Sequence, residues 1–221
     1  MSRNARIAAI VAATAAALAV IGAYVVSFLL AGPGTVVAAT TPGPTPTANL
    51  TLQTVAAIGT GPHPDWVTYF VKDAGGDWRH STVFQLPAHA TIHVTVENYD
   101  GASGLRNPFF GLPRGISGPM RVDGKVLPVL DPSLASHTFA VPDLGLSVPI
   151  EGVPDAAEDQ CEGAAPCGPN LAHRTITFTF HTGKPGTYRW QCFVPCAAGW
   201  QYGFGGPMQT FGYMDGFLKV V

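Results

Sequence analysis

Two separated pieces of the sequence contain side chains whose types could do chemistry. The first piece is His137–Val141 (HTFAV). The second extends from Gln191–Cys196 (QCFVPC) to Met214-Asp215-Gly216. Imidazole, thiolate and thioether groups are all metal ligands, and the two sulfur groups prefer soft ions. In an exported protein, two nearby cysteines are also expected as a disulfide. Metal binding and disulfide formation are therefore the two chemistries to weigh.

Together these pieces resemble the copper A domain of cytochrome c oxidase subunit II and, more broadly, the cupredoxins. The shared pattern places His-Ser/Thr-Phe on one strand and opens a second strand with Pro-Gly-x-Tyr, here residues 185–188. Gln-Cys-x-x-x-Cys follows, and a Met-x-Gly-x-φ-x-Val strand ends the domain. The resemblance covers residues from about 88 to 221. It implies an all-β, cupredoxin-like Greek-key β-sandwich and a copper centre for electron transfer.

The resemblance also implies a set of metal ligands, which in this sequence are His137, Cys192, Cys196 and Met214. Met208 is a spare thioether. The dinuclear family site has a second histidine, four residues after the second cysteine and three before the methionine. Trp200 and Phe211 occupy those positions here, and no histidine follows His181. The second ligand histidine is therefore missing, and the remaining donors favour one Cu(I) or an altered mononuclear centre.

A copper-free interpretation of the same residues stays open. Cys192 and Cys196 would then form a disulfide at the end of a strand, with His137 partly buried and Met214 in the core. Several aromatic residues surround the expected site: Trp190, Trp200, Tyr202, Phe204, Phe211 and Tyr213. They would either form a lid or docking face for a partner, or cap the end of the sandwich.

The first residues predict where the chain resides. Arg3 and Arg6, in a basic end over residues 1–6, precede an apolar run without charge over residues 7–31. Roughly 20 such residues cross a bilayer, whereas a cleavable signal has an apolar centre of about 7–15 residues. We therefore predict a single-pass anchor in the cell membrane, with the C-terminal domain extracytoplasmic. A signal peptide cleaved after Val37-Ala38-Ala39 is the alternative.

Beyond the anchor, composition and spacing organise the rest of the chain. Residues 32–50 are rich in Pro, Thr and Gly and predict a semi-rigid linker. Residues 51–221 are expected to form the cupredoxin-like domain. Within this domain Cys161 and Cys167 lie in the loop CEGAAPC, and in an exported chain we expect them to form a local disulfide.

Strand periodicity supports the expected sandwich. Residues 91–98 and 174–181 alternate apolar and polar side chains and are followed by turn residues. We predict further strands over 187–193 and 216–221, and over 50–58, 66–71 and 82–86. The Gly- and Pro-rich segment 101–136 is expected to be a long ordered excursion.

The composition excludes some functions and leaves others. A formal net charge of −2 with 12% charged residues argues against a nucleic-acid surface. The sequence contains no nucleophile elbow, phosphate-binding loop or HExxH motif that would indicate an enzyme. We expect the chain to transfer electrons as an oxidase-subunit-II-like component, with copper as its cofactor. We also expect it to contact the membrane. Integral-membrane oxidase subunits or a redox protein would be its partners. The alternatives are a copper-handling carrier and a metal-free accessory subunit.

Overall fold

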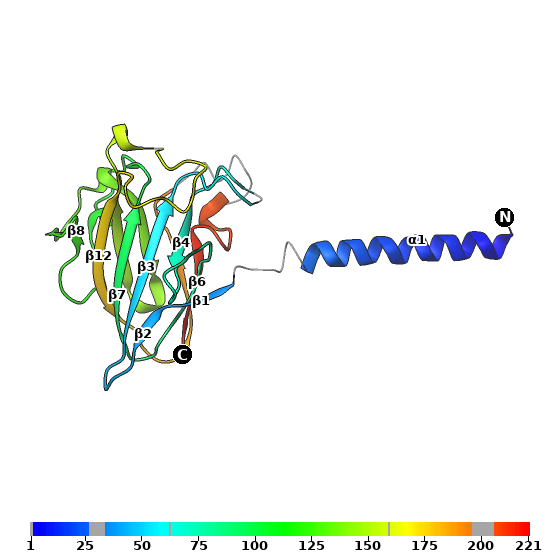
Figure 1. Cartoon of the computed structure of the whole chain (residues 1–221), viewed down its shortest axis with the longest axis horizontal. Helices are drawn as coiled ribbons and strands as arrows, with labels where there is room; N and C mark the ends of the chain where they lie inside the picture. The colour runs from blue at the N-terminus through cyan, green and yellow to red at the C-terminus, as the bar shows by residue number, and fades with distance from the viewer. Residues whose placement is uncertain (1, 27–33, 62, 159, 196–205) are drawn as a thin grey trace. The chain divides into compact units, whose positions relative to one another are not determined.

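The computed structural model describes residues 2–26, 34–61, 63–158, 160–195 and 206–221. The chain divides into two compact units, Met1–Gly32 and Pro33–Val221 (Figure 1).

The first unit is built on the helix α1 (Arg3–Tyr24). Ser2 caps its N-terminus, because the hydroxyl oxygen accepts a hydrogen bond from the backbone N–H of Ala5 over 3.3 Å. None of the residues of α1 is buried. Among the described residues, α1 is the one helix that is long enough and apolar enough to cross a membrane. The predicted apolar N-terminal helix is confirmed. A membrane anchor and a signal sequence share these properties.

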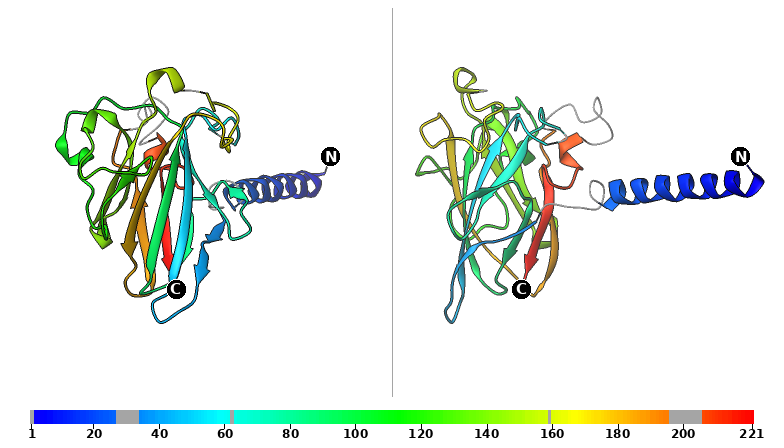
Figure 2. Two further views of the ribbon diagram at one scale, coloured as in Figure 1. Left: turned by 60° about the vertical axis from the view of Figure 1, so that its left-hand side comes forward. Right: turned by 45° about the vertical axis from the view of Figure 1, so that its right-hand side comes forward.

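Two β-sheets make up the second unit (Figure 1, Figure 2). The first sheet has the strand order β1-β6-β14-β13-β10-β11. Its strands are β1 (Thr35–Val37), β6 (Val83–Leu86), β10 (Ala135–Val141), β11 (Leu146–Glu151), β13 (Gly186–Gln191) and β14 (Asp215–Val220). The C-terminal strand β14 therefore lies inside the sheet, parallel to β6 and antiparallel to β13.

The second sheet has the order β5-β4-β3-β7-β12-β8-β9, and β2 also pairs with β3. Its strands are β2 (Ala39–Thr41), β3 (Thr47–Val55), β4 (Thr68–Lys72), β5 (Trp78–Arg79), β7 (Thr91–Asn98), β8 (Arg121–Val122), β9 (Lys125–Val126) and β12 (Arg174–His181). The chain crosses from one sheet to the other after β1, β5, β6, β9, β11 and β12. The predicted all-β Greek-key sandwich is confirmed.

Short 3₁₀ helices occupy the connections, namely η2 (Pro108–Gly111), η3 (Pro132–Leu134), η4 (Pro142–Leu144), η5 (Asp155–Ala157) and η6 (Gly206–Met208). The excursion 101–136 contains η2, η3 and the short hairpin β8–β9. It ends in β10, which begins at Ala135.

The core lies between the two sheets. β7 and β12 pair antiparallel in continuous register, and their alternation places Ile92, Val94 and Val96 on the buried face. Trp190 of the opposite sheet is fully buried, and its ring lies 5.3 Å from that of Phe139, centroid to centroid. This aromatic contact packs β10 against β13 within the core.

The segment predicted as a linker differs from that expectation. β1 pairs parallel with β6, and β2 pairs antiparallel with β3. Val36 and Ala38 are buried. From Thr35 onward, residues 32–50 therefore belong to the sandwich, because β-branched residues with an apolar face bury well at a sheet edge.

The expected disulfide between Cys161 and Cys167 is present. Both cysteines are buried in a second apolar cluster with Trp66, Tyr99 and Tyr213. The side-chain amide of Gln53 pairs with the backbone of Cys167, donating to its carbonyl over 3.1 Å and accepting from its N–H over 3.0 Å. The loop is thus fixed to β3.

Candidate metal centre

The fold brings together three of the four residues expected as metal ligands. His137 lies on β10, Cys192 directly follows β13, and Met214 directly precedes β14. β13 pairs with β10 at Gln191↔Ala140 and with β14 at Gln191↔Asp215. The backbone N–H of Cys192 donates to the carbonyl of Met214 over 3.0 Å. The backbone segments that carry these three side chains therefore lie next to one another in the first sheet.

All three of these side chains are fully buried. His137, Cys192 and Met214 each have 0% of their surface exposed. Cys196 and Trp200 lie outside the described residues, so the geometry of that half of the expected site stays a prediction.

A β-bulge precedes His137. The register between β10 and β11 shifts between Ala135 and His137. Bulges bend a strand locally and change the direction of the next side chain. This local irregularity of β10 sets where the imidazole points.

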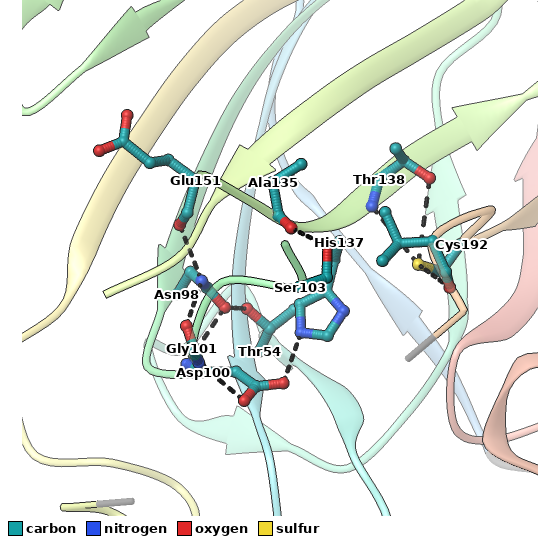
Figure 3. A network of polar contacts seen from close by, with 11 residues as sticks. Thr54, Asn98, Asp100, Gly101, Ser103, Ala135, His137, Thr138, Glu151 and Cys192 are labelled. Carbon is teal, nitrogen blue, oxygen red and sulfur yellow. Dashed lines mark hydrogen bonds and ion pairs between the residues drawn. The ribbon is translucent and has the colours of Figure 1, made fainter. Parts of the chain in front are cut away.

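Thr138 connects the histidine strand to the cysteine segment. Its backbone N–H donates to Sγ of Cys192 over 3.4 Å, and its hydroxyl oxygen accepts from the N–H of Phe193 over 2.7 Å. Figure 3 shows Thr138 beside Cys192. The first bond directs an N–H dipole at the sulfur of Cys192. The second closes the cysteine turn against β10.

The imidazole of His137 faces a carboxylate on one side. Its Nε2 lies 2.9 Å from Oδ2 of Asp100, and Figure 3 shows this short contact. The contact is an ion pair whose direction is poor for a linear hydrogen bond. Among the described residues, neither ring nitrogen makes a well-aligned one.

The surroundings of His137 shift its pKa in opposing directions. Burial lowers the pKa, whereas contacts with Asp100 and with Cys192 raise it, and the result is a pKa of about 9. Figure 3 shows Cys192 and Asp100 on different sides of His137. Sequence reasoning interpreted Tyr99-Asp100-Gly101 only as a turn and missed Asp100, since no local pattern links it to His137.

The spare thioether and the aromatic residues divide between core and surface. The carbonyl of Met208 accepts from the side-chain amide of Gln191 over 2.7 Å, and Met208 packs against the main core. Trp190 and Tyr213 are buried, as the capping interpretation predicts for them. Phe211 is 38% exposed beside Phe217. The other three aromatic residues of the loop lie outside the described residues.

The donor set fits a soft metal ion such as Cu(I). The buried imidazole, the thiol of Cys192 and the thioether of Met214 are donors of the type that copper prefers. Within the described part of the chain, no three His, Cys, Asp or Glu side chains form a metal-binding group. A complete site therefore requires the thioether of Met214 and the predicted ligand Cys196.

Comparisons with known proteins concern the fold. No protein-family model and no curated protein match the chain. One solved structure of the copper protein rusticyanin is 18% identical, covers 83% of this chain and 88% of its own, and has a TM-score of 0.35. Rusticyanin from Thiobacillus ferrooxidans is 18% identical, with coverage of 83% and 87% and a TM-score of 0.31. A laccase from Pediococcus acidilactici is 12% identical, with coverage of 86% and 29% and a TM-score of 0.35.

Proposed function

We propose that this chain is a membrane-anchored, extracytoplasmic cupredoxin-like protein that binds copper and transfers electrons as an oxidase-subunit-II-like component. The observation that supports the proposal best is the fully buried imidazole of His137 beside Cys192. A buried ring nitrogen without a well-aligned partner costs free energy unless a ligand satisfies it. A bound metal ion would satisfy it.

In this proposal the ligands are those expected from the sequence. Nδ1 of His137, the sulfurs of Cys192 and Cys196, and the thioether of Met214 would hold one copper ion. When bound, copper supplies exchange of one electron between Cu(II) and Cu(I). The N–H of Thr138 stabilises the sulfur of Cys192, and the strands hold the donors in place. The surrounding core excludes water from the site.

The location outside the cytoplasm has two supports. Arg3 and Arg6 precede the helix α1, and basic residues tend to stay on the cytoplasmic side. The disulfide between Cys161 and Cys167 is typical of an oxidising compartment. Integral-membrane oxidase subunits or a redox protein would be the partners, and catalysis would belong to them.

The test is copper binding by the full chain in detergent after reduction of its cysteines. We expect one tightly bound copper per chain and, after oxidation, a thiolate-to-copper absorption band with the electron paramagnetic resonance of a single Cu(II). Both should be lost in a Cys192→Ser/Cys196→Ser variant and in His137→Gln. They should persist in His93→Gln, which removes an exposed histidine from β7. The proposal would be contradicted if the native chain bound no more copper per chain than the Cys192→Ser/Cys196→Ser variant.

Two alternatives are separated by the same preparation. Trp200 and Phe211 at the expected histidine positions favour a metal-free accessory subunit, in which Cys192 and Cys196 would form a disulfide. Mass spectrometry of the native chain that finds this disulfide, together with no bound copper, would support this role. The soft donors also suit a copper carrier, which would bind Cu(I) tightly without a reversible Cu(II)/Cu(I) cycle in voltammetry.

A further inference from the structure

A buried polar network lies behind His137, on the side away from Cys192 (Figure 3). Its centre is Asn98, the last residue of β7, which is fully buried. The amide nitrogen of Asn98 donates to the carbonyl of Asp100 over 3.0 Å and to that of Glu151 over 2.8 Å. Its amide oxygen accepts from the hydroxyl of Thr54 and, over 3.4 Å, from the N–H of Asp100. Every donor and acceptor of this side chain is therefore used.

The network holds the backbone of Asp100 in place. Besides the contacts with Asn98, the carbonyl of Asp100 accepts from the N–H of Val153 over 3.0 Å. One carboxylate oxygen, Oδ1, accepts from the N–H of Gly101 over 2.8 Å. The other oxygen, Oδ2, is the atom 2.9 Å from Nε2 of His137. The backbone of Asp100 is thus held through Asn98 by residues from β3, β7 and β11, and its carboxylate is held by the N–H of Gly101.

A fixed carboxylate beside one imidazole nitrogen determines which nitrogen carries the proton. A carboxylate oxygen is an acceptor only, so it favours an N–H at Nε2. The lone pair of the neutral ring then lies on Nδ1, the ring nitrogen that does not face Asp100. In metal sites, such an outer carboxylate orients the histidine and raises its basicity as a ligand.

We infer that Asp100 is a positioning residue for the metal centre, whose carboxylate holds His137 with Nε2 protonated and presents Nδ1 to the metal. The inference rests on the proposed function for the identity of the metal. The orientation of the ring is a property of the protein without metal.

The first test measures the position of the proton in the reduced, metal-free full chain in detergent. Two-bond ¹⁵N–¹H spectra of histidine-labelled protein distinguish the two tautomers, and His137→Gln identifies the resonance. The spectra are recorded above the raised pKa of this imidazole, where the ring is neutral. We expect the proton on Nε2. A proton on Nδ1 in the native chain overturns the inference without any variant.

The second test compares Asp100→Asn with Asp143→Asn, which changes an exposed carboxylate in η4. In Asp100→Asn we expect a mixture of both tautomers and a Cu(I) affinity about 10- to 100-fold lower in competition with a chelator. Asp143→Asn should match the native chain in both measurements. Native tautomer and native affinity in Asp100→Asn would overturn the inference. A native chain that binds no Cu(I) would refute the proposed function, while the tautomer measurement still decides the role of Asp100.

Discussion

The backbone N–H of Thr138 donates to Sγ of Cys192 across 54 positions of sequence, over 3.4 Å. The same residue accepts from the N–H of Phe193 through its hydroxyl. Thr138 thus holds the strand of His137 and the turn of Cys192 against each other. The spacing between these two candidate metal ligands therefore does not depend on a bound metal.

Replacing Thr138 by valine keeps the shape of the side chain and removes the acceptor for the N–H of Phe193. We expect the free energy of unfolding of the full chain in detergent to fall by about 1–3 kcal/mol, because a partly buried donor loses its partner. Thr138→Ser keeps the hydroxyl and should cost only about 0.8 kcal/mol for the lost methyl group. Denaturant titration followed by tryptophan fluorescence measures both. A serine variant as unstable as the valine variant would show that the hydroxyl is unimportant.

Gly216 should not tolerate a side chain. An added Cβ would lie 1.9 Å from the carbonyl oxygen of Thr82 and 2.7 Å from Nε1 of Trp190. Nε1 of Trp190 donates to that same carbonyl over 2.9 Å. We expect Gly216→Ala to lower the free energy of unfolding by about 3 kcal/mol, because backbone and core must both shift. In the control Gly183→Ala, the nearest atom to the new Cβ is 4.0 Å away, and near-native stability is expected. Equal denaturant midpoints of unfolding in Gly216→Ala and Gly183→Ala would contradict this prediction.

His80 should make the stability depend on pH. Burial lowers its pKa, although its contact with the carbonyl of Gly212 opposes the shift. The folded state therefore binds this proton less readily than the unfolded state. The stability from this group is complete above the unfolded pKa of about 6.5 and is lost as the pH falls below it, by at most about 1.4 kcal/mol per pH unit.

The measurement compares unfolding free energies between about pH 7 and pH 5 for the native chain and His80→Gln. We expect the variant to lose less stability on acidification than the native chain. His93→Gln controls for the loss of an imidazole at an exposed position. Identical slopes in the native chain and His80→Gln would exclude His80 as the source.

Removing the disulfide should weaken the second cluster without unfolding the main core. The bond closes a loop with a sequence separation of 6. The chain-entropy relation gives about 2 kcal/mol for so short a loop. We expect a Cys161→Ser/Cys167→Ser variant to lose about this amount in denaturant titration. The native chain treated with a reductant that reaches the bond should lose a similar amount, whereas the double variant should not respond to reductant at all.

Much of the sandwich could be predicted because its strands have one buried face. β7 and β12 were predicted with their observed bounds, since apolar and polar side chains alternate along a half-exposed strand. β10 was expected only through the resemblance, and β11 was missed. Nearly all their residues are buried, so neither strand alternates. The Thr- and Pro-rich composition around the edge strands β1 and β2 predicts a linker, because composition does not show that Val36 and Ala38 are buried.

The sequence by itself determined the apolar helix, the sandwich class, the local disulfide and the types of the candidate ligands, because these depend on composition, period and short spacing. Only the tertiary structure decided that Asp100 faces His137 and that Thr138 contacts Cys192. Those contacts join residues 37 and 54 positions apart. They arise from a bulge in β10, a polar network around Asn98 and pairing between distant strands. Such long-range geometry leaves no periodic trace along the chain.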